Sequence, residues 1–275
     1  MKGLFKRNYN ELTKEEINGI NQSDKLWSKK MSKSGFSAED LFKFHELSGE
    51  AGHHYRSYFP NHYLPLNYTK HEYLGINKFE EFKKLLSNKK TNELDLLNFI
   101  YKTESYFIVE SLFDFYDFGH HDSYLFRELP LHPNFVVDFL LVGKNSGGYE
   151  FIFMEFEHPN EKATIKDGSF SKSFRNGIRQ VEDWDNWIDK NYPNLFSLFQ
   201  KVKNPRESLP EEFYVLDKSR IHYMVIAGRR GDFSDKTYRL KRKTPKNLKL
   251  LHYDNLLDAI HSYLFEQYKV HLKVQ

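Results

Sequence analysis

Three acidic residues interrupt two apolar runs in the segment FVVDFLLVGKNSGGYEFIFMEFEHP, residues 135–159, and this arrangement strongly constrains the fold. Side chains alternate between the two faces of a β-strand, so Glu155 and Glu157 point to the same face. The loop 143–148 is short and contains glycines, which favours an antiparallel hairpin, and Asp138 lies on the first of its two strands. A hairpin can therefore bring the three carboxylates together.

Burying these acids requires compensation. An ionised carboxylate that is buried without a cation or strong hydrogen bonds costs several kcal/mol. Mg²⁺ is a hard ion that accepts carboxylate, carbonyl and water oxygens, and it leaves coordination positions for phosphate and water. Mg²⁺, or Mn²⁺ in its place, also lowers the pKa of bound water and neutralises charge when a phosphodiester is attacked. The pattern thus indicates a metal-dependent phosphodiesterase. The alternative, solvated acids on an edge strand, fits the apolar flanking residues less well.

Composition narrows the class of protein. The 275 residues suit one large domain, or a core with an appendage, and the 17% aromatic and 39% hydrophobic residues favour a folded core over disorder. The chain has no cysteine, which excludes disulfides and thiolate chemistry and fits a cytoplasmic location. No apolar run is long enough for a membrane span, and no P-loop or dinucleotide motif is present. We therefore expect neither a membrane partner nor a nucleotide cofactor.

Hydrophobic periodicity predicts an α/β domain over residues 91–275. The predicted elements are a helix at 91–102, strands at 123–129, 134–142 and 149–157, a helix at 171–192, a strand at 220–228, and a closing strand and helix from 247.

Residues 1–90 are predicted to form a mainly helical accessory or regulatory region. Short helices are expected near 11–20, 37–47 and 77–87, with Ser37 and Asp40 at capping-box spacing, and the aromatic segment 51–73 is expected to lack regular structure.

Four segments together resemble a known family: VVDFLLV, FIFMEFEHP, RQVEDWDNWI and LLHYDNLLDAI, which begin at residues 136, 151, 179 and 250. Their order resembles the PD-(D/E)XK, or restriction-endonuclease-like, nucleases, and within these the Shedu-type immune nucleases. The resemblance extends over residues 92–267. It implies a restriction-endonuclease-like core of helix, three strands, helix and strand, cleavage of DNA in bacterial anti-phage defence, and assembly as a homo-oligomer.

The same resemblance suggests roles for individual residues. Asp138 and Glu155 match the two acids that bind Mg²⁺ in the family, while Glu157 stands where a lysine is usual and Val137 replaces a proline. A glutamate at this position can accept a proton from water or hold a second metal, but it cannot supply a lysine's positive charge.

Two helices carry further candidates. Gln180, followed by Trp184, resembles the glutamine and aromatic pair on the core helix of the family, although a tryptophan at helical spacing is also typical of ordinary core packing. Glu93 matches an acid that supports the metal in many relatives, and its alternative is a solvated acid in the first turn of a helix.

A basic segment at 228–249 is the candidate nucleic-acid contact. Such a run can follow a phosphate backbone, although a solvated hairpin explains the charge nearly as well. The residues proposed to contact DNA are Arg229, Arg230, Arg239, Lys241, Arg242 and Lys243.

The sequence leaves two functions open, with a scaffold whose fold serves oligomer assembly as a weaker third. The first is a Mg²⁺-dependent endonuclease in which Asp138, Glu155, Glu157 and Gln180 are catalytic and Asp138, Glu155 and Glu93 bind the metal. The second is an inactive protein with a nuclease fold that binds nucleic acid or a partner protein. The glutamate in the usual lysine position is the main argument for this alternative.

Overall fold

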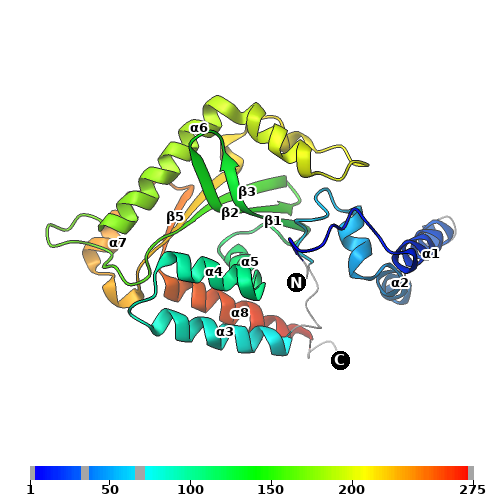
Figure 1. Ribbon diagram of the computed structural model, residues 1–275, viewed down its shortest axis with the longest axis horizontal. Helices are drawn as coiled ribbons and strands as arrows, with labels where there is room; N and C mark the ends of the chain where they lie inside the picture. Colours follow the sequence, from blue (N-terminus) through cyan, green and yellow to red (C-terminus); the bar gives the residue numbers. More distant parts are fainter. Residues whose placement is uncertain (1–3, 32–36, 66–71, 272–275) are drawn as a thin grey trace.

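A mixed five-stranded sheet forms the centre of the computed structural model, which describes residues 4–31, 37–65 and 72–271 (Figure 1). The strands lie in chain order, β1 (Asp122–Leu131), β2 (Phe135–Asn145), β3 (Gly148–Phe156), β4 (Ile221–Ile226) and β5 (Leu248–Leu251). The first three are antiparallel neighbours, whereas β4 runs parallel to β3 and β5 parallel to β4. A parallel pair needs a crossover connection, and the long helix α6 (Lys172–Val202) provides it between β3 and β4.

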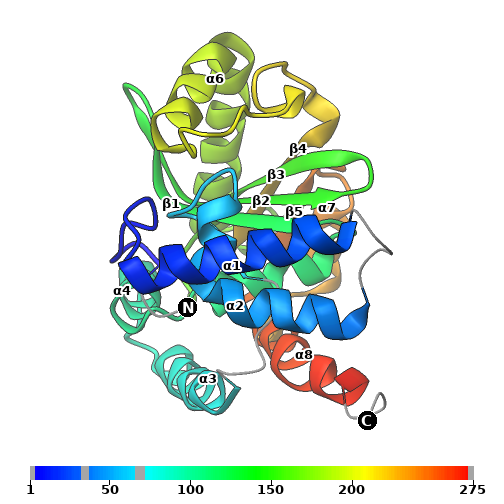
Figure 2. The same cartoon turned by 90° about the vertical axis from the view of Figure 1, so that its right-hand side faces the viewer.

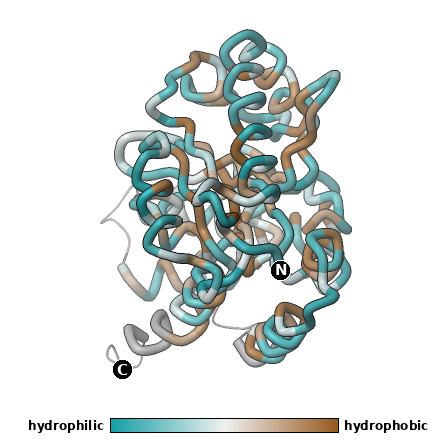
Figure 3. Tube along the Cα trace, turned by 90° about the vertical axis from the view of Figure 1, so that its left-hand side faces the viewer, coloured by the Kyte–Doolittle hydropathy of each residue, from teal (hydrophilic) through white to brown (hydrophobic). Residues whose placement is uncertain are grey.

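Helices cover both faces of this sheet, which explains why its strands are apolar on both sides. Helix α6 lies on one face, and α3 (Glu72–Ser87), α4 (Glu93–Thr103), α5 (Phe107–Glu110) and α8 (Tyr253–His271) lie on the other (Figure 1). The short helix α7 (Asp235–Lys241) lies near the start of α6. Two apolar clusters result, one between the sheet and α6 and one between the sheet and the other helices. In Figure 3 the hydrophobic segments accordingly converge on the interior.

The N-terminal helices α1 (Lys14–Met31) and α2 (Ala38–Arg56) stand together at one side of the molecule (Figures 1 and 2). The predicted capping box of Ser37 and Asp40 is confirmed, because each side chain accepts a hydrogen bond from the backbone of the other residue. The prediction of irregular structure over 51–73 is wrong for 51–56, which belong to α2, and for 72–73, which begin α3. Helix α2 bends at Gly49, where φ is +60°, and then continues to Arg56. Residues 66–71 of the predicted loop lie outside the described residues.

The helices and strands expected from the sequence are otherwise present, most with one to several extra residues at their ends, as for α1, which extends to Met31. Helix α3 packs against α4 and α8, and its Phe79, Phe82 and Leu86 belong to the cluster beneath the sheet. The proposed division of the chain at residue 90 stays a prediction. Over the described residues, no helix combines the length and apolar character needed to cross a bilayer.

Candidate active site

The hairpin of β2 and β3 places Asp138 and Glu155 at the same edge of the sheet. The strands are antiparallel, and Phe139 pairs with Met154, so the start of β2 lies beside the end of β3. The carboxylate of Asp138 accepts a hydrogen bond of 2.9 Å from the backbone nitrogen of Phe156. The negative charge of Asp138 also helps to raise the pKa of Glu155, so the two acids interact.

All three strand acids are poorly solvated. Glu155 is 5% exposed and Glu157 is 8% exposed. Burial is the largest cause that raises the pKa of all three acids, and the charges of neighbouring acids raise it further. The pKa of Glu157 is raised to about 8, and those of Asp138 and Glu155 are raised well above their ordinary range. The Oε2 atom of Glu155 is buried without a hydrogen-bond partner. No arginine or lysine lies within ion-pair distance of these three acids in the described part of the chain. The acids are therefore held together without compensating positive charge.

Helix α4 brings a fourth acid to this place. The side chain of its N-cap residue, Asn92, forms a capping box with Asp95, which sets the start of the helix so that Glu93 lies in the first turn. Burial raises the pKa of Glu93, and the charge of Glu93 in turn raises the pKa of Glu155 and of Glu157. The structure thus brings Glu93 within electrostatic range of the strand acids, and its role at a metal stays a prediction.

Helix α6 closes the site from the other side. Gln180 lies near Glu155 and lowers the pKa of that carboxyl, which partly offsets the effect of its burial. One turn earlier, a Cβ atom at Gly177 would lie 2.6 Å from Cγ1 of Val225 and 3.2 Å from Cγ of Glu157. Only glycine permits the helix to approach the acids this closely. Trp184 is fully buried in the core, and its indole nitrogen has no hydrogen-bond partner.

Sequence reasoning missed two residues that organise this site. The hydroxyl of Tyr253, which is fully buried, donates a hydrogen bond of 2.7 Å to the backbone oxygen of Glu157. The amide of Asn160 donates to the backbone oxygens of Asn88, at 3.2 Å, and Thr91, at 2.9 Å, and so ties the loop after β3 to the loop before α4. No local pattern predicts hydrogen-bond partners about 70 to 100 residues away in the chain.

These acids suit a hard divalent cation better than any other ligand. Within residues 4–31, 37–65 and 72–271, no three histidine, aspartate or glutamate side chains lie close enough together to hold a metal ion as they stand. Carboxylate oxygens are nevertheless the donors that Mg²⁺ prefers, and an unpartnered buried oxygen on Glu155 is an acceptor that lacks a positive neighbour. The donor atoms are of the chemical type that Mg²⁺ or Mn²⁺ binds.

The basic segment does not form the hairpin considered from the sequence. A short turn at Arg230–Asp232, helix α7 and strand β5 occupy it. Arg229 donates to both carboxylate oxygens of Asp254, at 2.7 and 3.1 Å, and to the backbone oxygen of Leu86, at 2.9 Å. Arg230 pairs with Asp258.

Their guanidinium groups thus already have partners within the protein. Of the other predicted contacts, Arg239, Arg242 and Lys243 are exposed and Lys241 is half-buried.

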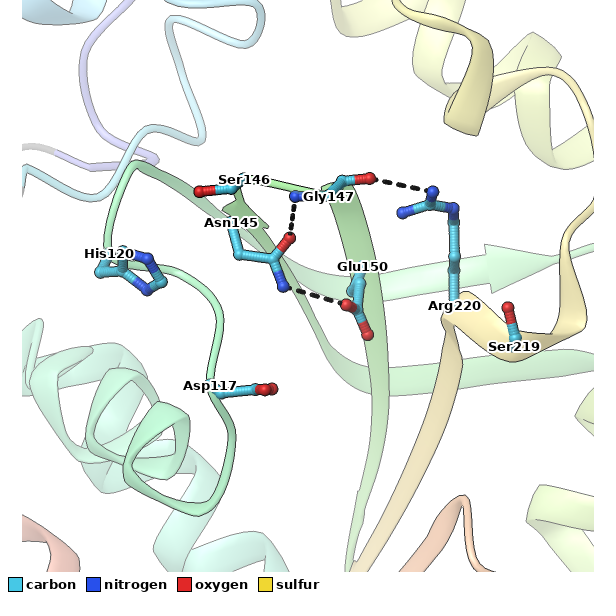
Figure 4. A pocket seen from close by; sticks show the side chains of 8 residues that line it. All are labelled: Asp117, His120, Asn145, Ser146, Gly147, Glu150, Ser219 and Arg220. Atoms are coloured by element: carbon cyan, nitrogen blue, oxygen red, sulfur yellow. Dashed lines mark hydrogen bonds between the residues drawn. The ribbon is translucent and has the colours of Figure 1, made fainter.

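A polar pocket lies at the opposite end of β2 and β3, at their connecting turn (Figure 4). Three of its side chains bond to one another or to the turn: Asn145 binds the backbone nitrogen of Gly147 and the carboxylate of Glu150, and Arg220 binds the backbone oxygen of Gly147. Its residues are Asp117, His120, Asn145, Ser146, Gly147, Glu150, Ser219 and Arg220. We assign this pocket a structural role.

Comparison with known proteins adds one finding. Residues 74–257 match the family model described as Shedu protein SduA, C-terminal. This match covers the sheet, α4, α5 and α6, most of α3, the start of α8 and all four acids. No curated protein matches the chain.

Proposed function

Because the chain belongs to the Shedu family, which is linked with anti-phage defence, we propose that it is a Mg²⁺-dependent nuclease that hydrolyses DNA phosphodiester bonds. We also propose that the sheet and its flanking helices form a restriction-endonuclease-like core. The order α4, β1, β2, β3, α6 and β4 is the order of elements which that core requires.

One observation carries the proposal. Asp138, Glu155 and Glu157 are poorly exposed at one end of β2 and β3, with the half-buried Glu93 beside them, and the charged neighbours that shift the pKa of these three acids are other acids. A protein that needed these residues only for stability would be expected to supply donors or cations to them. The arrangement is suited to a ligand that brings positive charge.

Each residue has a distinct part in the proposed reaction. Asp138 and Glu155 would hold the metal, and Glu93 would support it from the first turn of α4. The bound metal would supply a water of lowered pKa and neutralise charge on the phosphate. Glu157, whose pKa burial and neighbouring acids raise to about 8, is placed to accept a proton from the attacking water. Gln180 orients Glu155 through its amide.

Contact with DNA would use the exposed basic residues around α7. Arg239, Arg242 and Lys243 present their charges to solvent, and Lys241 stands between them on the same segment. We leave Arg229 and Arg230 out of the DNA contact, because their bonds to Asp254 and Asp258 compensate their charge.

The direct test incubates the purified protein with linear and circular DNA in Mg²⁺, Mn²⁺ or EDTA, beside an Asp138→Ala control. We expect cleavage with either metal, none in EDTA and none with the variant. Cleavage by the variant equal to that of the wild type would place the activity elsewhere.

A second function is supported by a specific observation. The site lacks a lysine, and no three side chains of the described residues already form a metal site. An inactive nuclease-fold protein that binds nucleic acid or a partner protein would show both features. This alternative predicts DNA binding without cleavage under every metal condition.

A further inference from the structure

A groove between α6 and the segment from α7 to β5 is separate from the acid site. It has a volume of about 620 Å³. Its walls carry Arg175, Arg179 and Glu182 from α6 and Lys243 from the segment after α7. Its apolar lining comes from Phe170, Ile178, Leu240, Pro245 and Leu248.

The groove has unbalanced positive charge. Arg175 donates a hydrogen bond to the backbone oxygen of Phe170, at 2.8 Å, and Glu182 is the single acid among its lining residues. Over the described ranges, the exposed side chains of Arg179 and Lys243 have neither an ion pair nor a hydrogen bond within the protein. The three cations and the apolar lining of the groove complement a ligand whose regularly spaced negative charges alternate with less polar groups. A nucleic acid has this chemistry, because its phosphates alternate with sugars and bases.

The position of the groove relative to the acids follows from the sheet register. Leu248, on the groove floor, pairs with Tyr223, which in turn pairs with Phe153. Glu155 lies two residues further along β3 and two strands across. At about 3.3 Å per residue and 4.8 Å per strand, the two places are roughly 12 Å apart along the sheet. This separation equals about three to four nucleotides at the duplex spacing of about 3.4 Å.

Helix α6 connects the two places. Gly177 and Gln180 face the acids, whereas Ile178 and Arg179 line the groove, so adjacent residues of one helix serve the two sites. We propose that the groove binds the phosphodiester backbone of the nucleic acid a few nucleotides from the bond at the acid site. This inference rests on the proposed function, because it places the same substrate on a second surface.

The test removes the two unpartnered charges. Arg179→Gln and Lys243→Gln would be combined and compared with Lys190→Gln and Lys201→Gln, which remove the same charge from exposed positions further along α6. Binding of labelled single-stranded and duplex oligonucleotides would be measured in EDTA over a series of salt concentrations. We expect the groove variant to bind at least about tenfold more weakly, as for loss of charge-assisted hydrogen bonds. The slope of log affinity against log salt should fall by about 1.4 for single strands and about 1.8 for duplex.

Two further readouts separate a substrate groove from a general effect of charge. Polyglutamate, an anion without bases, should compete poorly with the oligonucleotide. In cleavage assays the groove variant should have a raised KM with kcat retained, since the groove lies away from the reacting bond. An unchanged salt slope, an equal loss in the control variant or equal binding of polyglutamate would overturn the proposal.

The same experiment distinguishes failure of the groove from failure of the nuclease. If the wild type cuts DNA and the groove variant binds it normally, the groove proposal fails and the nuclease stands. A different outcome is that the wild type binds nucleic acid without cutting it, with binding lost in the Arg179→Gln and Lys243→Gln variant but not in the control variant. In that case the nuclease proposal fails and the groove proposal stands.

Discussion

Acidic side chains near the two ends of β3 differ in whether hydrogen-bond donors lie close to them. At the hairpin end, Asp122 accepts hydrogen bonds of 2.6 Å from the hydroxyls of both Tyr124 and Tyr149. Glu150, on the same end, lies 2.6 Å from the imidazole nitrogen of His222. These acids have donors close by, and they fasten the strands to their neighbours.

At the other end, the acids mainly face one another. Asp138 has one backbone donor, Glu155 keeps a buried oxygen without a partner, and Glu157 is buried near Glu93. The acids at both ends belong to neighbouring strands of the same sheet, so the difference lies in what the surrounding residues supply. Acids that accept hydrogen bonds from nearby donors stabilise the fold, whereas acids without such donors remain available to bind a ligand.

Neutralising one acid at each end gives the largest contrast. Glu155→Gln should lower the rate of DNA cleavage by about 10³-fold, since it removes a charged group that acts at the reacting phosphate. It should preserve or raise the melting temperature of the metal-free protein, because it relieves repulsion among the acids.

The matched control is Glu150→Gln at the hairpin end. It should cost about 1 kcal/mol of stability through its weakened contact with His222 and leave cleavage unchanged. Cleavage rates and thermal unfolding of both variants would be measured together. Equal loss of cleavage in the two would remove the functional distinction between the ends.

Glu157 tests how the acid end works. If it accepts the proton of the attacking water, Glu157→Gln should slow cleavage on the order of 10²-fold while DNA binding is retained. Glu157→Lys should keep partial activity, because a lysine there would stabilise charge electrostatically instead of accepting a proton. A wild type that is inactive with both metals, together with an active Glu157→Lys variant, would identify the protein as a binder.

A pH series tests the stability of the region around His54, which lies away from both ends of β3. His54 is buried, its Nδ1 lies 2.7 Å from the backbone oxygen of Pro60, and its ring stacks on Tyr9. Burial, followed by smaller effects of nearby charges, lowers the pKa of His54 to about 4 from its ordinary value of 6.5. The folded state therefore favours the neutral ring. The contribution of the neutral His54 ring to the free energy of unfolding is complete above pH 6.5. As the pH falls towards 4, about 3 kcal/mol of this contribution is lost, because the unfolded state binds a proton that the folded state does not.

Denaturant unfolding at pH 7.5, 6, 5 and 4.5 would measure this loss. Glu150→Gln and Glu155→Gln should lose the same His54-dependent stability as the wild type when the pH falls. In His54→Gln the free energy of unfolding should decrease less steeply with falling pH. An identical fall in His54→Gln would exclude His54 as its source.

Asn160 gives the smallest expected effect. Asn160→Ala removes two hydrogen bonds to the loop before α4 and should reduce cleavage about tenfold, through a displaced Glu93, and stability by about 1 to 2 kcal/mol. The informative comparison is a double-mutant cycle with Glu93→Gln. If Asn160 acts by positioning Glu93, its removal should have little further effect on cleavage when Glu93 is already neutral. Fully additive losses would assign Asn160 a merely structural role.

The local pattern of the sequence was sufficient for the strands and the hairpin. Alternating apolar residues and a short glycine loop predict β2 and β3, and antiparallel pairing then places Asp138 and Glu155 at one edge. Capping residues predicted the start of α2, and helical spacing of apolar residues predicted the helix that carries Glu93 in its first turn. These features depend on backbone conformation over a few residues, which is what periodicity and caps report.

Only the tertiary structure decided which long-range partners each polar residue would meet. Arg229 and Arg230 belong to a basic run that suits DNA, yet Asp254 and Asp258 at the start of α8 neutralise them. Asn160 and Tyr253 gave no local signal, because their partners lie far along the chain. Sequence periodicity reports the face on which a side chain lies, whereas charge compensation depends on which elements pack against that face.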